Sequence, residues 1–168
     1  MLAEKKLLIE AARMGTWDIL HREHGEMFTK VNLLEKALID LLQKHATDTD
    51  ETVDQQKAFL EAFEHGITLH FAVEEEALFP ELKKTGKDAE TLVSELLQEH
   101  RSILQKYSQI TQMSPRDTEK QGTLLKMLTE LQAHNRKEER TIPPIITQLS
   151  FAQLGKVDQA AKRLGYPV

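Results

Sequence analysis

The sequence contains no cysteine and few aromatic residues. Without cysteine there can be no disulfide, thiolate zinc site, cysteine-ligated iron–sulfur cluster or cysteine nucleophile. Any metal must therefore be held by His and carboxylate side chains, which suit iron, manganese or zinc. Aromatic residues make up only 5% of the chain, so that Leu, Ile, Val, Ala and Met must fill the core, as is common in helical bundles.

Long apolar runs and an excess of positive charge are also missing. No run approaches the roughly 18 apolar residues that a membrane-spanning helix needs, and the N-terminal residues are too charged for a secretory signal. The net charge is −5, whereas nucleic-acid binding requires a basic surface. We therefore expect a cytoplasmic protein without a membrane or nucleic-acid partner. The 168 residues suit a single domain over 1–168, with its core bundle at about 16–146.

Apolar residues recur three or four positions apart along most of the chain, and strand-like alternation is missing. This spacing predicts an all-α protein. Because the connections are short, neighbouring long helices should run antiparallel. We expect four long helices over about 17–45, 50–85, 88–112 and 115–143, with short extra helices over 4–13 and 145–164.

Several residues predict where these helices begin and end. Asp48, Thr49 or Asp50 can cap the second long helix. Ser114-Pro115 offers an N-cap followed by a proline at the first helical position. Pro143-Pro144 should end or kink the fourth long helix, because proline lacks the backbone donor.

An internal repeat is the most informative feature of the sequence. The pattern L-x-x-E-H occurs at 20–24 and again at 96–100. The pattern H-x-x-x-E-E occurs at 70–75 and at 134–139, followed each time by an apolar residue and a proline. The first and third long helices therefore match, as do the second and fourth, and two helix hairpins of one design can bring their inward stripes together.

The spacing within the repeat suits metal binding. Residues four apart lie on one helix face, about 6 Å apart along the axis, and a carboxylate with two oxygens can bridge two metals. The Glu residues next to these positions (Glu23, Glu75, Glu99 and Glu139) are candidates to orient the imidazoles. The six candidate ligands are His24, His70, Glu74, His100, His134 and Glu138.

A bundle without metal is the simpler alternative. A lone His on an apolar stripe is more often a hydrogen-bonded core residue than a ligand, and H-x-x-x-E recurs by chance in a chain this rich in Glu. Glu74 and Glu138 are harder to explain in this way, because each lies on an apolar stripe and a buried carboxylate needs a partner. The repeat, which adds Glu only on its two matching helices, favours metal binding.

Residues 16–146 resemble the hemerythrin-like, or HHE cation-binding, family, and H-x-x-x-E-E-x-x-L-F-P at 70–80 is its most specific motif here. The resemblance implies an up-down-up-down four-helix bundle around a non-haem diiron centre. It also implies that the cofactor is two iron ions with an oxo or hydroxo bridge, held by the six candidate ligands. Glu74 and Glu138 would then be the bridging carboxylates.

The sequence departs from the oxygen-carrying hemerythrins in two places. Leu104 stands where those proteins have a second His on the third helix, and the last helix has H-x-x-x-E rather than H-x-x-x-x-D. One imidazole fewer implies an open coordination position. This favours binding of, or reaction with, a small oxidant such as oxygen, nitric oxide or peroxide, in sensing, scavenging or iron-centre repair. His65 could replace the missing ligand but should lie on another face, and we expect His21 and His45 at the surface.

Other functional classes fit the sequence less well or stay open. A ferritin-like oxidase would use E-x-x-H on two helices, and no His has Glu three residues before it. The H-E-x-x-H motif of zinc hydrolases is missing. A metal-dependent structural or regulatory interaction module, without catalytic turnover, is the main alternative. The terminal helices could cover the bundle ends or form a homodimer.

Overall fold

The computed structural model describes residues 15–44, 50–114 and 117–168, and within these ranges it contains helices and no strand. The expected helix over 4–13 lies outside the described residues, as do Asp48 and Thr49. The all-α prediction is confirmed for the described part of the chain. None of the helices described there is long and apolar enough to cross a membrane. The single-domain assignment stays a prediction.

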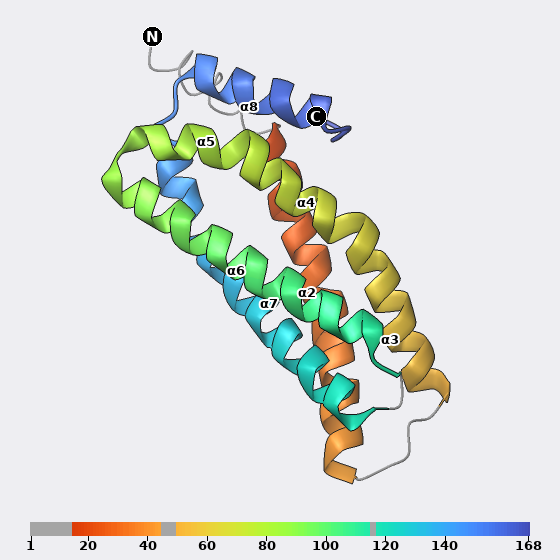
Figure 1. Cartoon of the computed structure of the whole chain (residues 1–168). Helices are drawn as coiled ribbons and strands as arrows, with labels where there is room; N and C mark the ends of the chain where they lie inside the picture. Colours follow the sequence, from red (N-terminus) through yellow and green to blue (C-terminus); the bar gives the residue numbers. More distant parts are fainter. Residues whose placement is uncertain (1–14, 45–49, 115–116) are drawn as a thin grey trace.

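In the described part of the chain there are four long helical runs and one shorter helix (Figure 1). The first is α2, Thr16–Lys44, and the third and fourth are α6, Lys87–Gln112, and α7, Thr118–Ile146. The shorter helix is α8, Phe151–Arg163. The second run consists of α3 (Asp50–Ala62), η1 (Phe63–Ile67), α4 (Thr68–Val73), η2 (Glu74–Leu78), α5 (Phe79–Leu82) and η3 (Lys83–Thr85).

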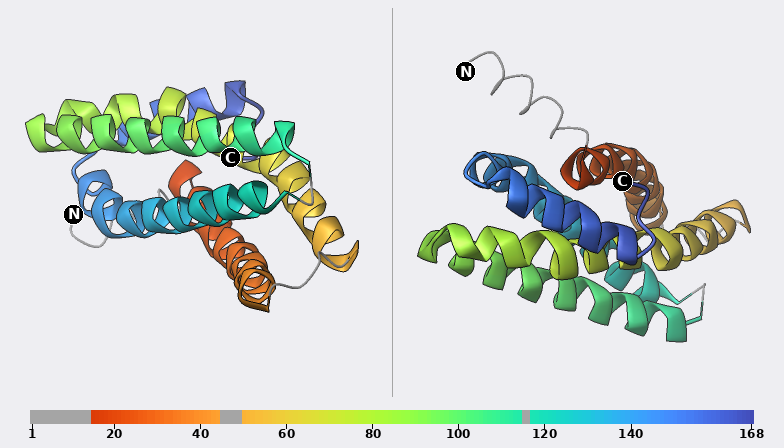
Figure 2. Two further views of the ribbon diagram at one scale, coloured as in Figure 1. Left: turned by 60° about the horizontal axis from the view of Figure 1, so that its bottom comes forward. Right: turned by 90° about the horizontal axis from the view of Figure 1, so that it is seen from above.

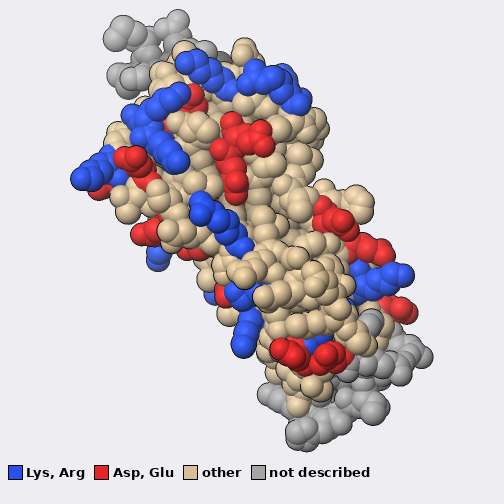
Figure 3. Space-filling model, viewed as in Figure 1, with Lys and Arg blue, Asp and Glu red and all other residues tan. Residues whose placement is uncertain are grey.

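The long runs lie side by side, and α8 crosses one end of them (Figures 1 and 2). Helix α7 packs against both α2 and α6, and α3 packs against α2. Helix α8 contacts η2, α5 and α2. On the face drawn in Figure 3, acidic and basic side chains are interspersed over the helices.

One helix start agrees with the prediction and another differs. Helix α3 begins at Asp50 as expected, so that Asp50 is not its cap, and the other two candidate caps lie outside the described residues. Helix α7 begins at Thr118, and its N-cap is Asp117, whose carboxylate accepts a hydrogen bond from the Glu119 N–H at 2.9 Å. The prediction of Ser114 as N-cap is therefore wrong; its carbonyl instead accepts from the Asp117 N–H.

The end of α7 also differs from the prediction. The helix continues through Pro143 and Pro144 and ends at Ile146. These prolines lie in the last turns of the helix, where each removes only the backbone donor that would have met the carbonyl of Glu139 or Arg140. The closing helix therefore begins at 151 rather than 145, with Ser150 in a capping box.

The apolar core is divided into two clusters by a layer of polar residues. Leu20 belongs to one cluster and Met27 to the other, and His24 lies between them on α2. On α6, Leu96 and Ile103 are likewise in different clusters, one turn on either side of a buried His. A layer of polar side chains therefore lies between the long helices, with an apolar cluster on each side of it.

Candidate metal centre

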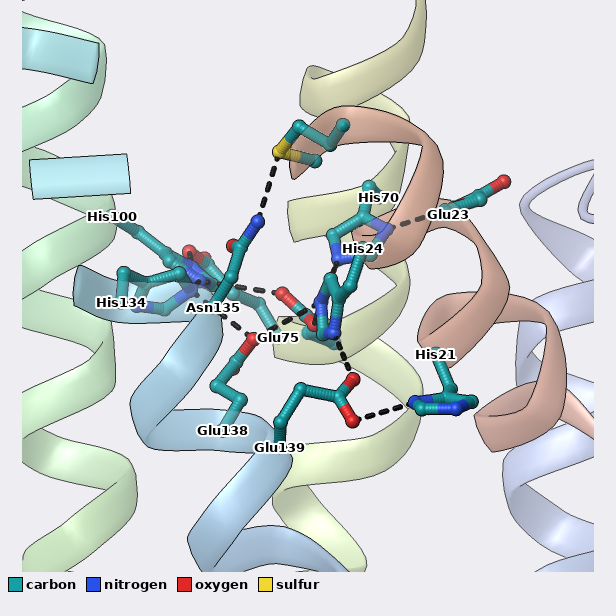
Figure 4. A network of polar contacts seen from close by, with 12 residues as sticks. His21, Glu23, His24, His70, Glu75, His100, His134, Asn135, Glu138 and Glu139 are labelled. Atoms are coloured by element: carbon teal, nitrogen blue, oxygen red, sulfur yellow. Dashed lines mark hydrogen bonds and ion pairs between the residues drawn. The ribbon is translucent and has the colours of Figure 1, made fainter. Parts of the chain in front are cut away.

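The polar layer brings the six candidate ligands together, and Figure 4 labels all of them except Glu74. Four helical runs contribute to it: α2, the α4–η2 segment, α6 and α7. Figure 4 shows Glu138 lying between one pair of imidazoles and the other. Every member is almost completely buried, with at most 2% of its surface exposed. The members are His24, His70, Glu74, His100, His134 and Glu138.

These donors divide into two groups that share both carboxylates. One group adds His24 and His70 to the two Glu, and the other adds His100 and His134. Within each group the donor atoms lie within 4.8 Å of one another. The two oxygens of Glu74 face different groups: Oε1 is 3.0 Å from His70 Nε2, and Oε2 is 3.3 Å from His100 Nε2. One Glu138 oxygen, Oε2, is 3.3 Å from the Nε2 atoms of both His24 and His134.

The outer nitrogen of each imidazole is bonded to a carboxylate from a neighbouring helix. Each of these Glu residues stands directly beside a candidate ligand in the sequence. The contacts form a closed ring. Helix α2 supplies the carboxylate that contacts the His of α4, η2 supplies that for α6, α6 that for α7, and α7 that for α2. The pairs are Glu23–His70 at 2.7 Å, Glu75–His100 at 2.8 Å, Glu99–His134 at 2.9 Å and Glu139–His24 at 2.6 Å. The prediction that these four Glu orient the imidazoles is confirmed in geometry.

This ring fixes which ring nitrogen carries the proton in a neutral imidazole. A carboxylate accepts, so each Nδ1 donates, and Nε2 presents its lone pair to the centre. Yet the Nε2 atoms of His24 and His70 lie 2.9 Å apart, and those of His100 and His134 lie 3.1 Å apart. All these lone pairs converge on the same small space.

The carboxylates in the layer lack hydrogen bonds as well. All four oxygens of Glu74 and Glu138 are buried without a hydrogen-bond partner. Buried polar atoms without a partner are rare and costly. A set of inward lone pairs on nitrogen and oxygen fits cations, and imidazole with carboxylate suits iron, manganese or zinc. The residues present therefore fit a metal centre.

The pKa shifts of these groups also indicate that the layer favours positive charge. Burial lowers the pKa of His24, but the carboxylates of Glu138 and Glu139 outweigh it and raise that pKa to about 11. Burial also lowers the pKa of His70, but the charge of Glu74 helps to raise it to about 9. Burial raises the pKa of Glu74, yet the imidazoles beside it hold it well below its usual range. Cations in the centre would satisfy the same carboxylates.

Two short π-helical segments, η1 and η2, flank His70, and the apolar spacing of the sequence did not predict them. In η2 the Phe79 N–H donates to the Glu74 carbonyl, five residues back. Pro80 follows and has no N–H to offer, which favours this wider turn. Pro80 was therefore the feature of the sequence that could have indicated an irregular turn here. Such segments are common at functional sites, and this one keeps Glu74 inside while Glu75 reaches His100.

The remaining histidines lie apart from the six. His65 is exposed, and its Nδ1 lies 2.8 Å from the Glu61 carbonyl of its own helix. His21 has 62% of its side chain exposed and contacts Glu139 at 2.5 Å. His45 lies outside the described residues. Leu104 is partly buried against the apolar cluster that includes Met27.

Two further contacts were not predicted, because Lys137 occupies an unspecified position of the repeat and Tyr166 lies outside it. Lys137 donates to Glu99 at 2.8 Å, and Tyr166 donates to Glu23 at 2.6 Å. Each contact adds a second partner to a carboxylate that already holds an imidazole.

Comparison with known proteins identifies the family to which the chain is similar. The family model described as hemerythrin HHE cation-binding domain matches residues 16–146. No curated protein and no solved structure matches the chain.

Proposed function

The chain belongs to the hemerythrin HHE cation-binding family, and we propose that it is a non-haem diiron protein that binds or reduces a small oxidant. In this proposal the four long helical runs form an up-down-up-down bundle. The six converging residues hold two iron ions, with Glu74 and Glu138 shared between them. The oxidant is oxygen, nitric oxide or peroxide.

The shared carboxylates are the observation that carries this proposal. Two groups of four donors with both Glu residues in common match a pair of ions better than a single one. Each ion would have four protein ligands. Iron commonly takes six, so the ligand set leaves positions for solvent or a small molecule. The Leu at 104 adds no donor there.

The chain's own residues would orient the metal ligands and keep bulk water away from the centre. The ring of four outer Glu residues accepts the Nδ1–H of each imidazole, which fixes its tautomer and raises the basicity of Nε2. The two apolar clusters exclude bulk water from both sides of the layer. Phe71 covers the His100 ring, with the ring centroids 3.7 Å apart and the planes 11° from parallel. A bound iron pair would supply reversible one-electron changes and open coordination positions.

The test is to reconstitute the purified protein with ferrous iron, count iron per chain, and record visible spectra. Spectra are taken oxidised, reduced, and reduced then exposed to oxygen or nitric oxide. Near two irons per chain and a new band on exposure to gas are expected. His70→Ala should lower the iron content, while His65→Ala, at an exposed His, should match the wild type.

Other outcomes have definite meanings. Two ions per chain that never respond to either gas would contradict the oxidant chemistry and favour a metal-dependent structural or regulatory module. Failure to bind iron, with a colourless protein after reconstitution, would contradict the diiron centre itself.

A further inference from the structure

The C-terminal segment reaches the metal centre through Tyr166. Its hydroxyl donates to Glu23 Oε2 at 2.6 Å, and the same oxygen lies 2.7 Å from His70 Nδ1. A hydrogen-bonded chain therefore runs from Tyr166 through Glu23 to His70, whose Nε2 is one of the inward donors. Tyr166 is buried, with 4% of its surface exposed. It lies beyond residues 16–146, which the family model matches.

The end of α8 holds Tyr166 in place. Gly165 adopts φ = 84° after the helix, a left-handed conformation that favours glycine. The Gly165 N–H donates to the Lys162 carbonyl, and the Tyr166 N–H donates to the Ala161 carbonyl, both at 3.0 Å. These two bonds form a Schellman motif. This turn holds Tyr166 where its hydroxyl reaches Glu23.

The other end of this contact is anchored as well. Asp158 of α8 accepts hydrogen bonds from the Thr16 N–H at 2.9 Å and from the Thr16 hydroxyl at 2.7 Å. Thr16 begins α2, the helix that carries Glu23. Helix α8 and the start of α2 are therefore fixed to each other, and the Tyr166–Glu23 distance is set by packed structure at both ends.

The four outer Glu residues differ in their additional partners. Glu99 also accepts from Lys137 at 2.8 Å, and Glu139 also contacts His21 at 2.5 Å. Within the described part of the chain, Glu23 is the one of the four whose additional partner is a phenol. Burial, followed by the nearby Glu23, raises the pKa of Tyr166 well above its usual range. The hydroxyl thus keeps its proton and remains a donor.

We propose that Tyr166 is a positioning residue for the metal centre, which controls through Glu23 how strongly His70 donates to its metal. This inference rests on the proposed function, because it takes His70 as a ligand. Tyr166, which follows α8 and lies outside the residues that the family model matches, would then tune the metal position to which His70 belongs.

The direction of the effect follows from the shared oxygen. Glu23 Oε2 divides its accepting capacity between the tyrosine O–H and the His70 N–H. If the tyrosine O–H is removed, the carboxylate attracts the His70 N–H more strongly. The imidazole then carries more negative charge and becomes a stronger donor through Nε2. A stronger donor stabilises the oxidised metal, so the reduction potential should fall.

The experiment compares Tyr166→Phe with Tyr107→Phe, which changes the only other tyrosine in the chain. The Tyr107 hydroxyl lies 3.5 Å from the Leu60 carbonyl, in a different hydrogen bond. Zinc-loaded, histidine-labelled proteins are used to read the Nδ1–H proton resonance of His70 by NMR. Iron-loaded proteins give the reduction potential by mediated redox titration. Metal content and thermal melting are recorded for each variant.

We expect Tyr166→Phe to keep the wild-type metal content, move the His70 Nδ1–H resonance downfield and make the potential more negative. Tyr107→Phe should change neither quantity. Glu23→Gln replaces the acceptor with a weaker one and should shift both quantities in the opposite direction. A merely structural role for Tyr166 would alter melting without this paired and opposite response.

Two results would overturn the inference, and they are distinguishable. If zinc binds the wild type but Tyr166→Phe leaves the His70 resonance and the potential where Tyr107→Phe leaves them, the tuning role is wrong and the metal centre stands. If neither zinc nor iron binds the wild type, the proposed function fails and the inference fails with it.

Discussion

Replacement of His134 and replacement of Glu74 should have different effects on metal content, because the two residues belong to different numbers of donor groups. His134 belongs to one group of four, whereas Glu74 belongs to both. His134→Ala leaves the group of His24, His70, Glu74 and Glu138 complete. We therefore expect His134→Ala to bind one ion per chain and Glu74→Ala to bind none at the same metal concentration.

The size of the effect on stability can be worked from linkage. A ligand present at 100 times its dissociation constant stabilises the folded state by about 2.7 kcal/mol. For a chain of this length, each kcal/mol raises the melting temperature by about 2–4 °C. Each ion should therefore contribute roughly 5–11 °C. His134→Ala should keep about half of the metal-dependent rise in melting temperature, and Glu74→Ala should keep none.

Native mass spectrometry gives the number of bound ions, and thermal melts with and without metal give the stabilisation. His65→Ala is the matched control, because this exposed His contacts only its own helix backbone among the described contacts. It should retain both ions and the full stabilisation. The reasoning is refuted if Glu74→Ala still binds two ions, or if His134→Ala and Glu74→Ala are indistinguishable in both measurements.

Three further effects follow from the structure. Glu99→Ala should weaken metal binding by about 10–100-fold in chelator competition, because Glu99 holds the His134 Nδ1–H at 2.9 Å. In metal-free protein, burial lowers the pKa values of His70 and His134, but neighbouring carboxylates raise both to about 9. Protons are thus bound more tightly in the folded state, and unfolding free energy measured by denaturant should fall from about pH 6.5 to 9. Gly165→Ala should lower the unfolding free energy by about 1–2 kcal/mol, because φ there is 84°, whereas Gly155→Ala, inside α8, should raise it by about 0.4–1 kcal/mol.

Each of these has a result that would contradict it. Unchanged metal affinity in Glu99→Ala would show that the outer carboxylate does not support His134. A metal-free protein that becomes more stable between pH 6.5 and 9 would show that its imidazoles are neutral when folded. Equal effects of the two glycine substitutions would show that the turn before Tyr166 carries no backbone strain. An added Cβ meets no atom within 4 Å at either glycine, so steric crowding cannot account for a difference.

The sequence predicted the helices well where apolar periodicity was long and unbroken. Helix α2 was expected over 17–45 and spans Thr16–Lys44, and α6 was expected over 88–112 and spans Lys87–Gln112. The end of the second run near 85 was also predicted, whereas the fourth helix was expected to end at 143 and continues to Ile146. Proline removes one donor wherever it occurs, but its effect depends on what the freed carbonyl meets. Pro80 lies beside a π-helical turn, while Pro143 lies in a helix that simply continues.

The candidate site was predicted through the repeat, because matching helices in a bundle place matching positions at the same depth. The same pattern singled out Glu23 and Glu99, although each contacts an imidazole of another helix rather than the His that follows it in the sequence. Tyr166 could not be found in this way. It follows α8, and its approach to Glu23 spans 143 residues. That approach depends on the turn at Gly165 and on how α8 packs across the bundle, which no local spacing encodes.

The most direct test of the central claim is anomalous diffraction at the iron absorption edge from crystals of the iron-loaded protein. The account predicts two peaks in the polar layer, one beside His24 and His70 and the other beside His100 and His134, with Glu74 in contact with both. A single peak, or peaks outside this layer, would contradict the diiron centre.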